Sequence, residues 1–131
     1  MKRCFAAALS SVALLVATHA SAAAIYPERA YQEHWCGQNG GVTEVTLADR
    51  TRVDCLTATH AVEVDFARKW AEAIGQSLYY ARATGRAPGV VLILEAPGDR
   101  RFLRRIGSAV RETGIVVWTI TPDEIDGTGR P

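Results

Sequence analysis

The feature that most constrains this chain is a pair of apolar, β-branched runs that three carboxylates interrupt. Asp54 lies in the first run, residues 52–56, and Glu63 and Asp65 lie in the second, residues 61–66. Such runs are typical of strands with a buried face. A carboxylate in such a strand is unfavourable unless a partner stabilises its charge. A metal ion is one such partner, and a solvated sheet face is the alternative explanation.

The surrounding pattern predicts the order of the elements. We expect helices at residues 26–36, 67–84 and 99–113, and strands at residues 42–47, 52–56, 61–66, 89–94 and 115–120. Short turns between the first three strands predict an antiparallel meander, and the two later, continuously apolar strands are typical of strands buried on both faces. The order αβββαβαβ predicts an α/β fold: one mixed sheet with helices on both faces.

The two ends of the chain differ from this core. Lys2 and Arg3 precede an uncharged apolar segment, and residues 20–22 form a small-x-small cleavage signal. This pattern predicts a signal peptide over residues 1–22 and export to the periplasm or the extracellular medium. Its removal leaves 13 basic against 14 acidic side chains, a net charge of about −1. We expect one domain over residues 23–121, followed by a polar, frayed tail over residues 122–131.

Two cysteines, Cys36 and Cys55, follow the predicted cleavage site. In an oxidising compartment such a pair tends to form a disulfide bond, which would stabilise the fold by about 3 kcal/mol in the chain-entropy model. Two buried free thiols are the alternative. We favour the disulfide bond.

Strand geometry places the carboxylates relative to one another. Successive side chains point to opposite faces, so Glu63 and Asp65 share a face, while Val62 and Val64 face the core. If the second and third strands pair, Asp54 and Glu63 meet across the sheet. Two nearby carboxylates raise one another's pKa unless a cation lies between them, and oxygen ligands of this kind suit Mg²⁺ or Mn²⁺.

The helix that follows carries Lys69, the only lysine after Lys2. Lys69, Gln76 and Tyr80 lie on one stripe of this helix. A cation in the first turn is disfavoured by the helix dipole, so nearby carboxylates or a phosphate would explain its position. A simple ion pair with Asp65, four residues earlier, is the alternative.

Residues 26–120 resemble the PD-(D/E)xK nuclease superfamily, which includes restriction endonucleases and Holliday-junction resolvases. The resemblance rests on the αβββαβ order, on Asp54, and on the segment VEVDFARKWAEAIGQSLYY, residues 62–80. It implies that Asp54 and Glu63 bind metal and that Gln76 is the polar helix residue of several branches. Glu33, on the first helix, could match the additional acidic residue of some branches; a plain surface residue is the alternative, and we favour it.

The chain departs from that superfamily at Asp65, where the motif has lysine. Lys69 is the residue that could replace this lysine from the helix. The resemblance implies metal-assisted hydrolysis of phosphodiester bonds, with Mg²⁺ or Mn²⁺ held by Asp54, Glu63 and a backbone carbonyl near Val64. Lys69 would orient water or stabilise developing charge, and Gln76 would position water or phosphate.

Two further interpretations remain open. A basic helix face could bind a nucleic-acid backbone or could simply be solvated; its members are Arg100, Arg101, Arg104 and Arg105. Aspartate at position 65 could also mark a catalytically inactive domain on the same fold, which would act as a binding or structural protein of the cell envelope.

Overall fold

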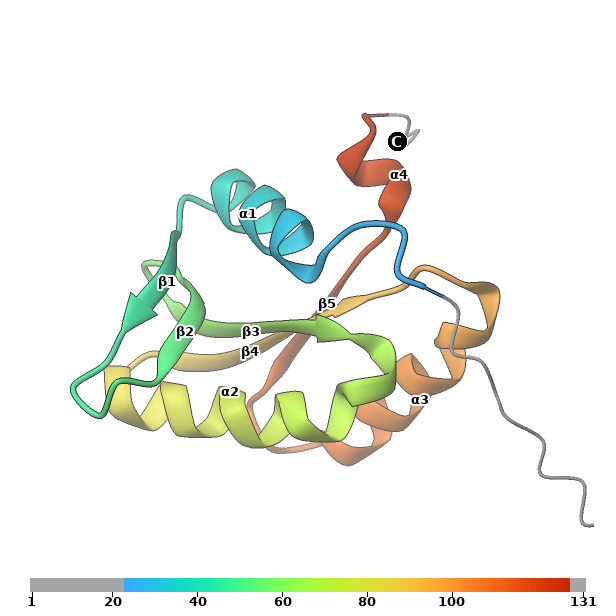
Figure 1. Ribbon diagram of the computed structural model, residues 1–131. Helices are drawn as coiled ribbons and strands as arrows, with labels where there is room; N and C mark the ends of the chain where they lie inside the picture. The colour runs from blue at the N-terminus through green and yellow to red at the C-terminus, as the bar shows by residue number, and fades with distance from the viewer. Residues whose placement is uncertain (1–22, 128–131) are drawn as a thin grey trace, which may run out of the picture.

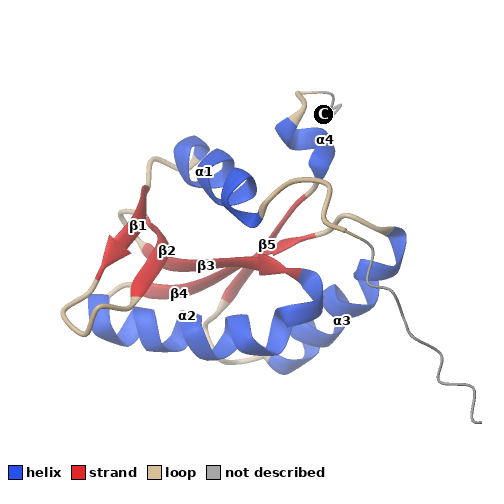
Figure 2. Ribbon diagram, in the orientation of Figure 1, coloured by secondary structure: helices blue, strands red, loops and turns tan. Residues whose placement is uncertain are grey.

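The computed structural model describes residues 23–127 and confirms the α/β fold class (Figures 1 and 2). The main elements are α1 (Glu28–Gln38), β1 (Val42–Thr46), β2 (Arg52–Leu56), β3 (His60–Phe66), α2 (Trp70–Thr84), β4 (Ala87–Ile93), α3 (Arg100–Ala109), β5 (Val116–Ile120) and α4 (Pro122–Ile125). Short 3₁₀ turns, η1 (Ala67–Lys69) and η2 (Pro97–Asp99), precede α2 and α3. The predicted signal peptide lies outside the described residues.

The five strands form one mixed sheet in the order β1-β2-β3-β4-β5. β1, β2 and β3 form the predicted antiparallel meander, and β3, β4 and β5 run parallel to one another. Helices α1 and α4 lie over one face of the sheet, and α2 and α3 lie over the other (Figure 1). Within residues 23–127, no helix is long and apolar enough to cross a membrane.

Each face of the sheet has its own core. Against α1, the buried residues are Tyr31, Trp35, Cys36, Cys55, Val62, Val64, Val91, Ile93 and Ile120. Against α2 and α3, they are Ala73, Val90, Leu92, Ile106, Val110 and Ile115. The alternation of side chains along β4 supplies Val91 and Ile93 to one core and Val90 and Leu92 to the other, because successive side chains leave a strand on opposite faces. This explains why β4 is continuously apolar.

The predicted disulfide bond is confirmed. Cys36 of α1 and Cys55 of β2 are bonded, with 5.6 Å between their Cα atoms, and both are fully buried. Gly41, just before β1, lies against the bond: a Cβ atom there would come within 2.7 Å of Cys36 Sγ. The disulfide bond therefore fixes α1 to the meander and requires a glycine beside it.

The expected frayed tail differs from the structure at residues 122–127. Residues Pro122–Ile125 form α4, and the Thr121 backbone N–H donates to Glu124 Oε2 over 2.7 Å at its start. Ile125 packs against the α1 core, and the Tyr26 hydroxyl donates to Asp126. The polar composition of residues 122–131 predicts fraying, but capping of the first turn of α4 and the apolar contact of Ile125 stabilise residues 122–127.

Candidate active site

A cleft opens where β2 separates from β3. The two strands pair at Leu56↔Ala61 and Cys55↔Val62, whereas β3 goes on pairing with β4 as far as Phe66. Beyond Cys55, the Val64 backbone N–H donates to Asp54 Oδ2 over 2.8 Å. A side-chain carboxylate thus takes the place of a strand carbonyl, and the last part of β3 becomes an edge that faces the cleft.

The cleft is a cavity of about 390 Å³ lined almost entirely by polar side chains. Its walls come from α1, β2, β3, α2 and the β1–β2 hairpin. They comprise Glu28, Glu44, Arg50, Thr51, Arg52, Asp54, Glu63, Asp65, Lys69, Glu72, Gln76 and Tyr80. The residues that the sequence singled out at 54, 63, 65, 69 and 76 therefore line one cavity.

Glu63 is the most unusual carboxyl group in the cleft. Its side chain is only 6% exposed, and its Oε2 atom has no hydrogen-bond partner among the described residues. Burial, and then the negative charge of Asp54 and Asp65, raise its pKa to about 9. At neutral pH Glu63 therefore keeps its proton, and the neighbouring Asp54 carboxylate helps to hold it there.

Asp54 is the partner of Glu63 and is half-buried. Burial raises its pKa to about 6, and repulsion from Glu44 and Asp65 acts in the same direction. The hydrogen bonds from Val64 and Glu63 oppose this shift because they stabilise the charged carboxylate. Near neutral pH the pair therefore carries about one negative charge.

The other half of the cleft holds a cation between two carboxylates. Lys69 Nζ lies 3.2 Å from Asp65 Oδ1 and 3.8 Å from Glu28 Oε2. Asp65 is 3% exposed, whereas the Lys69 side chain is 41% exposed and lies at the cleft mouth. The pKa of Lys69 is raised because these partners outweigh its partial burial. The predicted pairing of Lys69 with a nearby carboxylate is thus present.

Glu28 is a member of the cleft that the sequence reasoning missed. Burial raises its pKa to about 7, and a hydrogen bond with Asp65 adds to the shift. Glu33, the residue that the resemblance offered for this role, is exposed, as the favoured interpretation predicts, and it pairs with Arg29 on α1, 2.6 Å away. Positions 28 and 33 lie about 140° apart around the helix, so only one can face the cleft. The buried residues Tyr31 and Gln32 follow Glu28 by three and four positions, so Glu28 lies on the same side of α1 as they do.

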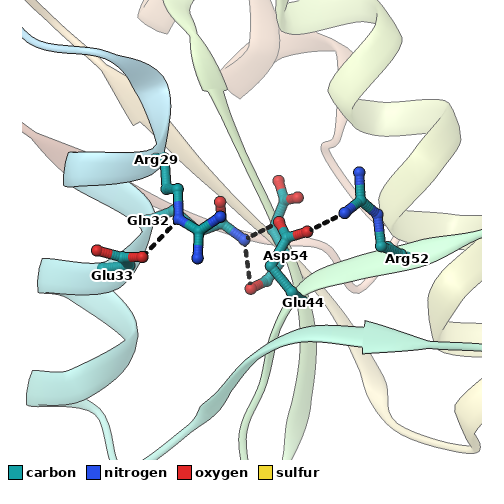
Figure 3. A network of polar contacts seen from close by, with 6 residues as sticks. All are labelled: Arg29, Gln32, Glu33, Glu44, Arg52 and Asp54. Atoms are coloured by element: carbon teal, nitrogen blue, oxygen red, sulfur yellow. Dashed lines mark hydrogen bonds and ion pairs between the residues drawn. The ribbon is translucent and has the colours of Figure 1, made fainter.

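Glu44 is the second member that was missed. It sits in β1 with φ +55°, a conformation that a non-glycine residue rarely adopts. Gln32 Nε2 donates to Glu44 Oε1 over 2.8 Å and to the Asp54 carbonyl over 2.7 Å, and Arg52 Nη1 lies 2.6 Å from Glu44 Oε2 (Figure 3). The network ties α1 to β1 and β2 and brings another carboxylate beside Asp54.

The two remaining groups of predicted residues separate. Gln76 lines the cleft, and its side chain hydrogen-bonds Tyr80 on the next turn of α2. The arginines at positions 100, 101, 104 and 105 are exposed on α3 and do not line the cleft. Any contact between these arginines and a nucleic acid bound in the cleft would have to extend past η1.

The donor set of the cleft fits a hard divalent cation. Asp54 and Glu63 offer carboxylate oxygens, and the unpartnered Oε2 of Glu63 is a ready ligand atom. Mg²⁺ is commonly held by one or two carboxylates together with several waters. Among residues 23–127, no group of three or more His, Cys, Asp or Glu side chains is arranged around a common metal position. An ion held by Asp54 and Glu63 would therefore take its remaining ligands from water.

Comparison with known proteins adds no relative. No family model, curated protein or solved structure matches this chain.

Proposed function

We propose that the cleft hydrolyses phosphodiester bonds of nucleic acid with the help of Mg²⁺ or Mn²⁺. The observation that carries this proposal is the state of Glu63: a buried residue, only 6% exposed, whose carboxyl group has one oxygen unpartnered among the described residues and lies beside a second carboxylate. Such an arrangement is unfavourable in a protein that uses it only for structure. A cation between the two carboxylates would remove the penalty.

Asp54 and Glu63 would hold the ion. Asp54 is already oriented by the Val64 N–H, and Glu63 is fixed by the surrounding strand. When bound, the ion supplies Lewis-acid chemistry, which makes water a better nucleophile near neutral pH and offsets charge on the phosphate. The shared proton of the pair must leave before both carboxylates can act as ligands.

Lys69 is the cation that would face the phosphate. Asp65 holds its ammonium at the cleft mouth, where the N–H donors that Asp65 does not use can point to phosphate oxygens or to the attacking water. Water would form the new P–O bond while the bond to the leaving sugar oxygen breaks. One proton leaves the water, and one reaches the leaving oxygen. Gln76 would orient the water or the phosphate from α2.

This assignment agrees with the resemblance to the PD-(D/E)xK nucleases. We propose that Asp54 and Glu63 are their two motif carboxylates and that Lys69, held by Asp65, acts in place of the motif lysine. We also propose that Glu28, and not Glu33, is the additional acidic residue of the first helix. Export through the predicted signal peptide would keep such an activity away from the cell's own DNA.

One observation favours a rival function. Lys69 is neutralised by Asp65 and Glu28, as in a purely structural ion pair. A catalytically inactive domain on this fold, which acts as a binding or structural protein of the cell envelope, would retain the cleft without its chemistry.

A cleavage assay separates the two functions. Protein purified with its disulfide bond intact would be incubated with labelled DNA and RNA in Mg²⁺, Mn²⁺ or EDTA. The matched variants are Asp54→Asn and Glu63→Gln, which keep the shape of each side chain. The control is Arg82→Gln, at an exposed position near the end of α2. We expect cleavage that requires metal and falls at least about 100-fold in both cleft variants. No cleavage of any substrate with either metal would refute the proposal.

A further inference from the structure

A second cavity adjoins the cleft at the end of β3. It has a volume of about 300 Å³ and is lined by residues that precede α1, by η1, and by the segment that leads into α3. The side chains that carry the argument are Phe66, Arg68, Arg101 and Phe102. The cavity differs from the cleft in its chemistry, because it presents phenylalanine rings beside guanidinium groups, whereas carboxylates are the commonest side chains of the cleft lining.

The aromatic rings are paired with guanidinium groups. Arg68 Cζ lies 4.9 Å from the centre of the Phe66 ring. Arg101 Cζ lies 4.6 Å and Arg105 Cζ 5.5 Å from the centre of the Phe102 ring. Both phenylalanines are half-buried and all three arginines are exposed. Planar cations and ring faces are therefore presented together at the surface.

The positive charge of this cavity has no ion-pair partner. None of the three arginines forms an ion pair with a carboxylate of the part of the chain that the structure describes. The two carboxylates in the cavity wall have other partners. Glu95 accepts from the Tyr31 hydroxyl over 2.6 Å, and Asp99 accepts from the backbone N–H groups of Glu95 and Ala96 over 3.0 Å. The arginines therefore remain available to an anion.

The turn that follows β3 joins the two cavities. Asp65 and Lys69 line the carboxylate cleft, whereas the residues between them, Phe66, Ala67 and Arg68, line the second cavity. A chain-like ligand that reaches Lys69 in the cleft therefore needs only to cross η1 to reach Arg68 and Phe66.

We propose that the second cavity binds an unpaired segment of the nucleic acid whose backbone enters the cleft. Guanidinium groups attract phosphates, and an aromatic face stacks on a base that is not paired. In a duplex the base faces are already stacked on their neighbours, so these rings select single-stranded substrate or a single-stranded end. This inference rests on the proposed function and specifies the class of its substrate.

The test is a binding measurement that does not depend on cleavage. Fluorescein-labelled oligothymidylate and oligouridylate of about 12 nucleotides, and a DNA duplex of the same length, would be titrated with protein in EDTA. Fluorescence anisotropy reports the Kd. The variants are Arg68→Gln, Arg101→Gln and Phe102→Leu; the last keeps an apolar side chain but removes the ring. Arg82→Gln removes one exposed positive charge from the far end of α2 and is the control.

We expect single strands to bind more tightly than the duplex, and each of the three variants to weaken single-strand binding by on the order of tenfold. Arg82→Gln should change the Kd less than twofold. Equal affinity for duplex and single strands, or unchanged binding in Phe102→Leu and Arg101→Gln, would overturn the inference even if cleavage is observed. Tight, variant-sensitive binding without any cleavage would support the inference and refute the hydrolytic function instead.

Discussion

Lys69 Nζ, at the end of η1, lies 3.2 Å from Oδ1 of Asp65, four residues earlier in β3. In the assignment proposed above, Asp65 stands where the PD-(D/E)xK motif has lysine, and it holds the lysine that would replace it. Asp65 is buried, whereas the Lys69 side chain is 41% exposed, so under the proposed function the carboxylate would anchor the lysine and the ammonium would contact the ligand.

This relationship predicts the effect of two substitutions on cleavage. Lys69→Gln removes the charge and should lower the cleavage rate by about 100-fold or more, the magnitude expected for loss of a charged donor to developing phosphate charge. Asp65→Asn keeps the shape but loosens Lys69, so a smaller loss of about tenfold is expected. Single-turnover cleavage rates on one labelled substrate check both values. A Lys69→Gln variant that cleaves at the wild-type rate would exclude a role for this lysine in cleavage.

The raised pKa values of three carboxyl groups predict that, without metal, the free energy of unfolding falls as pH rises, the opposite of the usual effect of carboxylates. Burial raises the pKa of Glu63 from 4.5 to about 9, that of Asp54 from 3.8 to about 6 and that of Glu28 from 4.5 to about 7. The folded protein then binds more protons than the unfolded chain. Its free energy of unfolding should therefore fall as pH rises from about 4 to about 9, by at most about 1.4 kcal/mol per pH unit for each proton.

Urea unfolding in EDTA across this pH range measures the slope. Glu63→Gln cannot ionise and should flatten the alkaline part of the curve. Mg²⁺ should restore stability most at high pH, where the carboxylates are ionised. A free energy of unfolding that rises steadily toward pH 9 in EDTA would contradict the described burial of these groups.

The disulfide bond predicts a large loss of stability on reduction. The double variant Cys36→Ser, Cys55→Ser should be less stable than the wild type by about 3 kcal/mol. The reduced wild type should match it, because both lack the same link between α1 and β2. Denaturant unfolding with and without a reducing agent checks this, and stability that does not respond to reduction would argue against the bond.

The positive φ of Glu44 predicts an unusual order of two variants. Both Glu44→Gly and Glu44→Ala lose the contacts with Gln32 and Arg52. Only glycine adopts φ +55° without strain, so Glu44→Gly should be more stable than Glu44→Ala by about 1 kcal/mol. Thermal unfolding of the two proteins side by side is sufficient. Equal stability would show that the backbone at Glu44 relaxes when its side chain is lost.

Much of the architecture follows from the sequence because it depends on local periodicity. The alternation at Val62 and Val64 predicted the core face of β3, and the change of period after Phe66 predicted α2. The presence of only two cysteines after the predicted cleavage site, Cys36 and Cys55, together with the predicted export, predicted the disulfide bond. Each of these signals involves residues close in the chain or a pairing with only one solution.

The residues that were missed depend on contacts distant in sequence. Glu28 faces the cleft because the disulfide bond and the aromatic stripe of α1 set the rotation of that helix. Glu44 turns toward Asp54 only because its backbone adopts a positive φ, which no sequence pattern around it indicates. The order at α4 likewise depends on a core contact of Ile125 that a polar segment does not reveal.

The most direct test of this account is whether Asp54 and Glu63 bind a divalent ion together. Calorimetric titration of the protein with Mn²⁺ or Mg²⁺ should show binding at one site. That binding should be lost in both Asp54→Asn and Glu63→Gln and retained in Arg82→Gln. Binding that persists unchanged in both cleft variants, or no binding of either ion at millimolar concentration, would contradict the assignment of this cleft as a metal site.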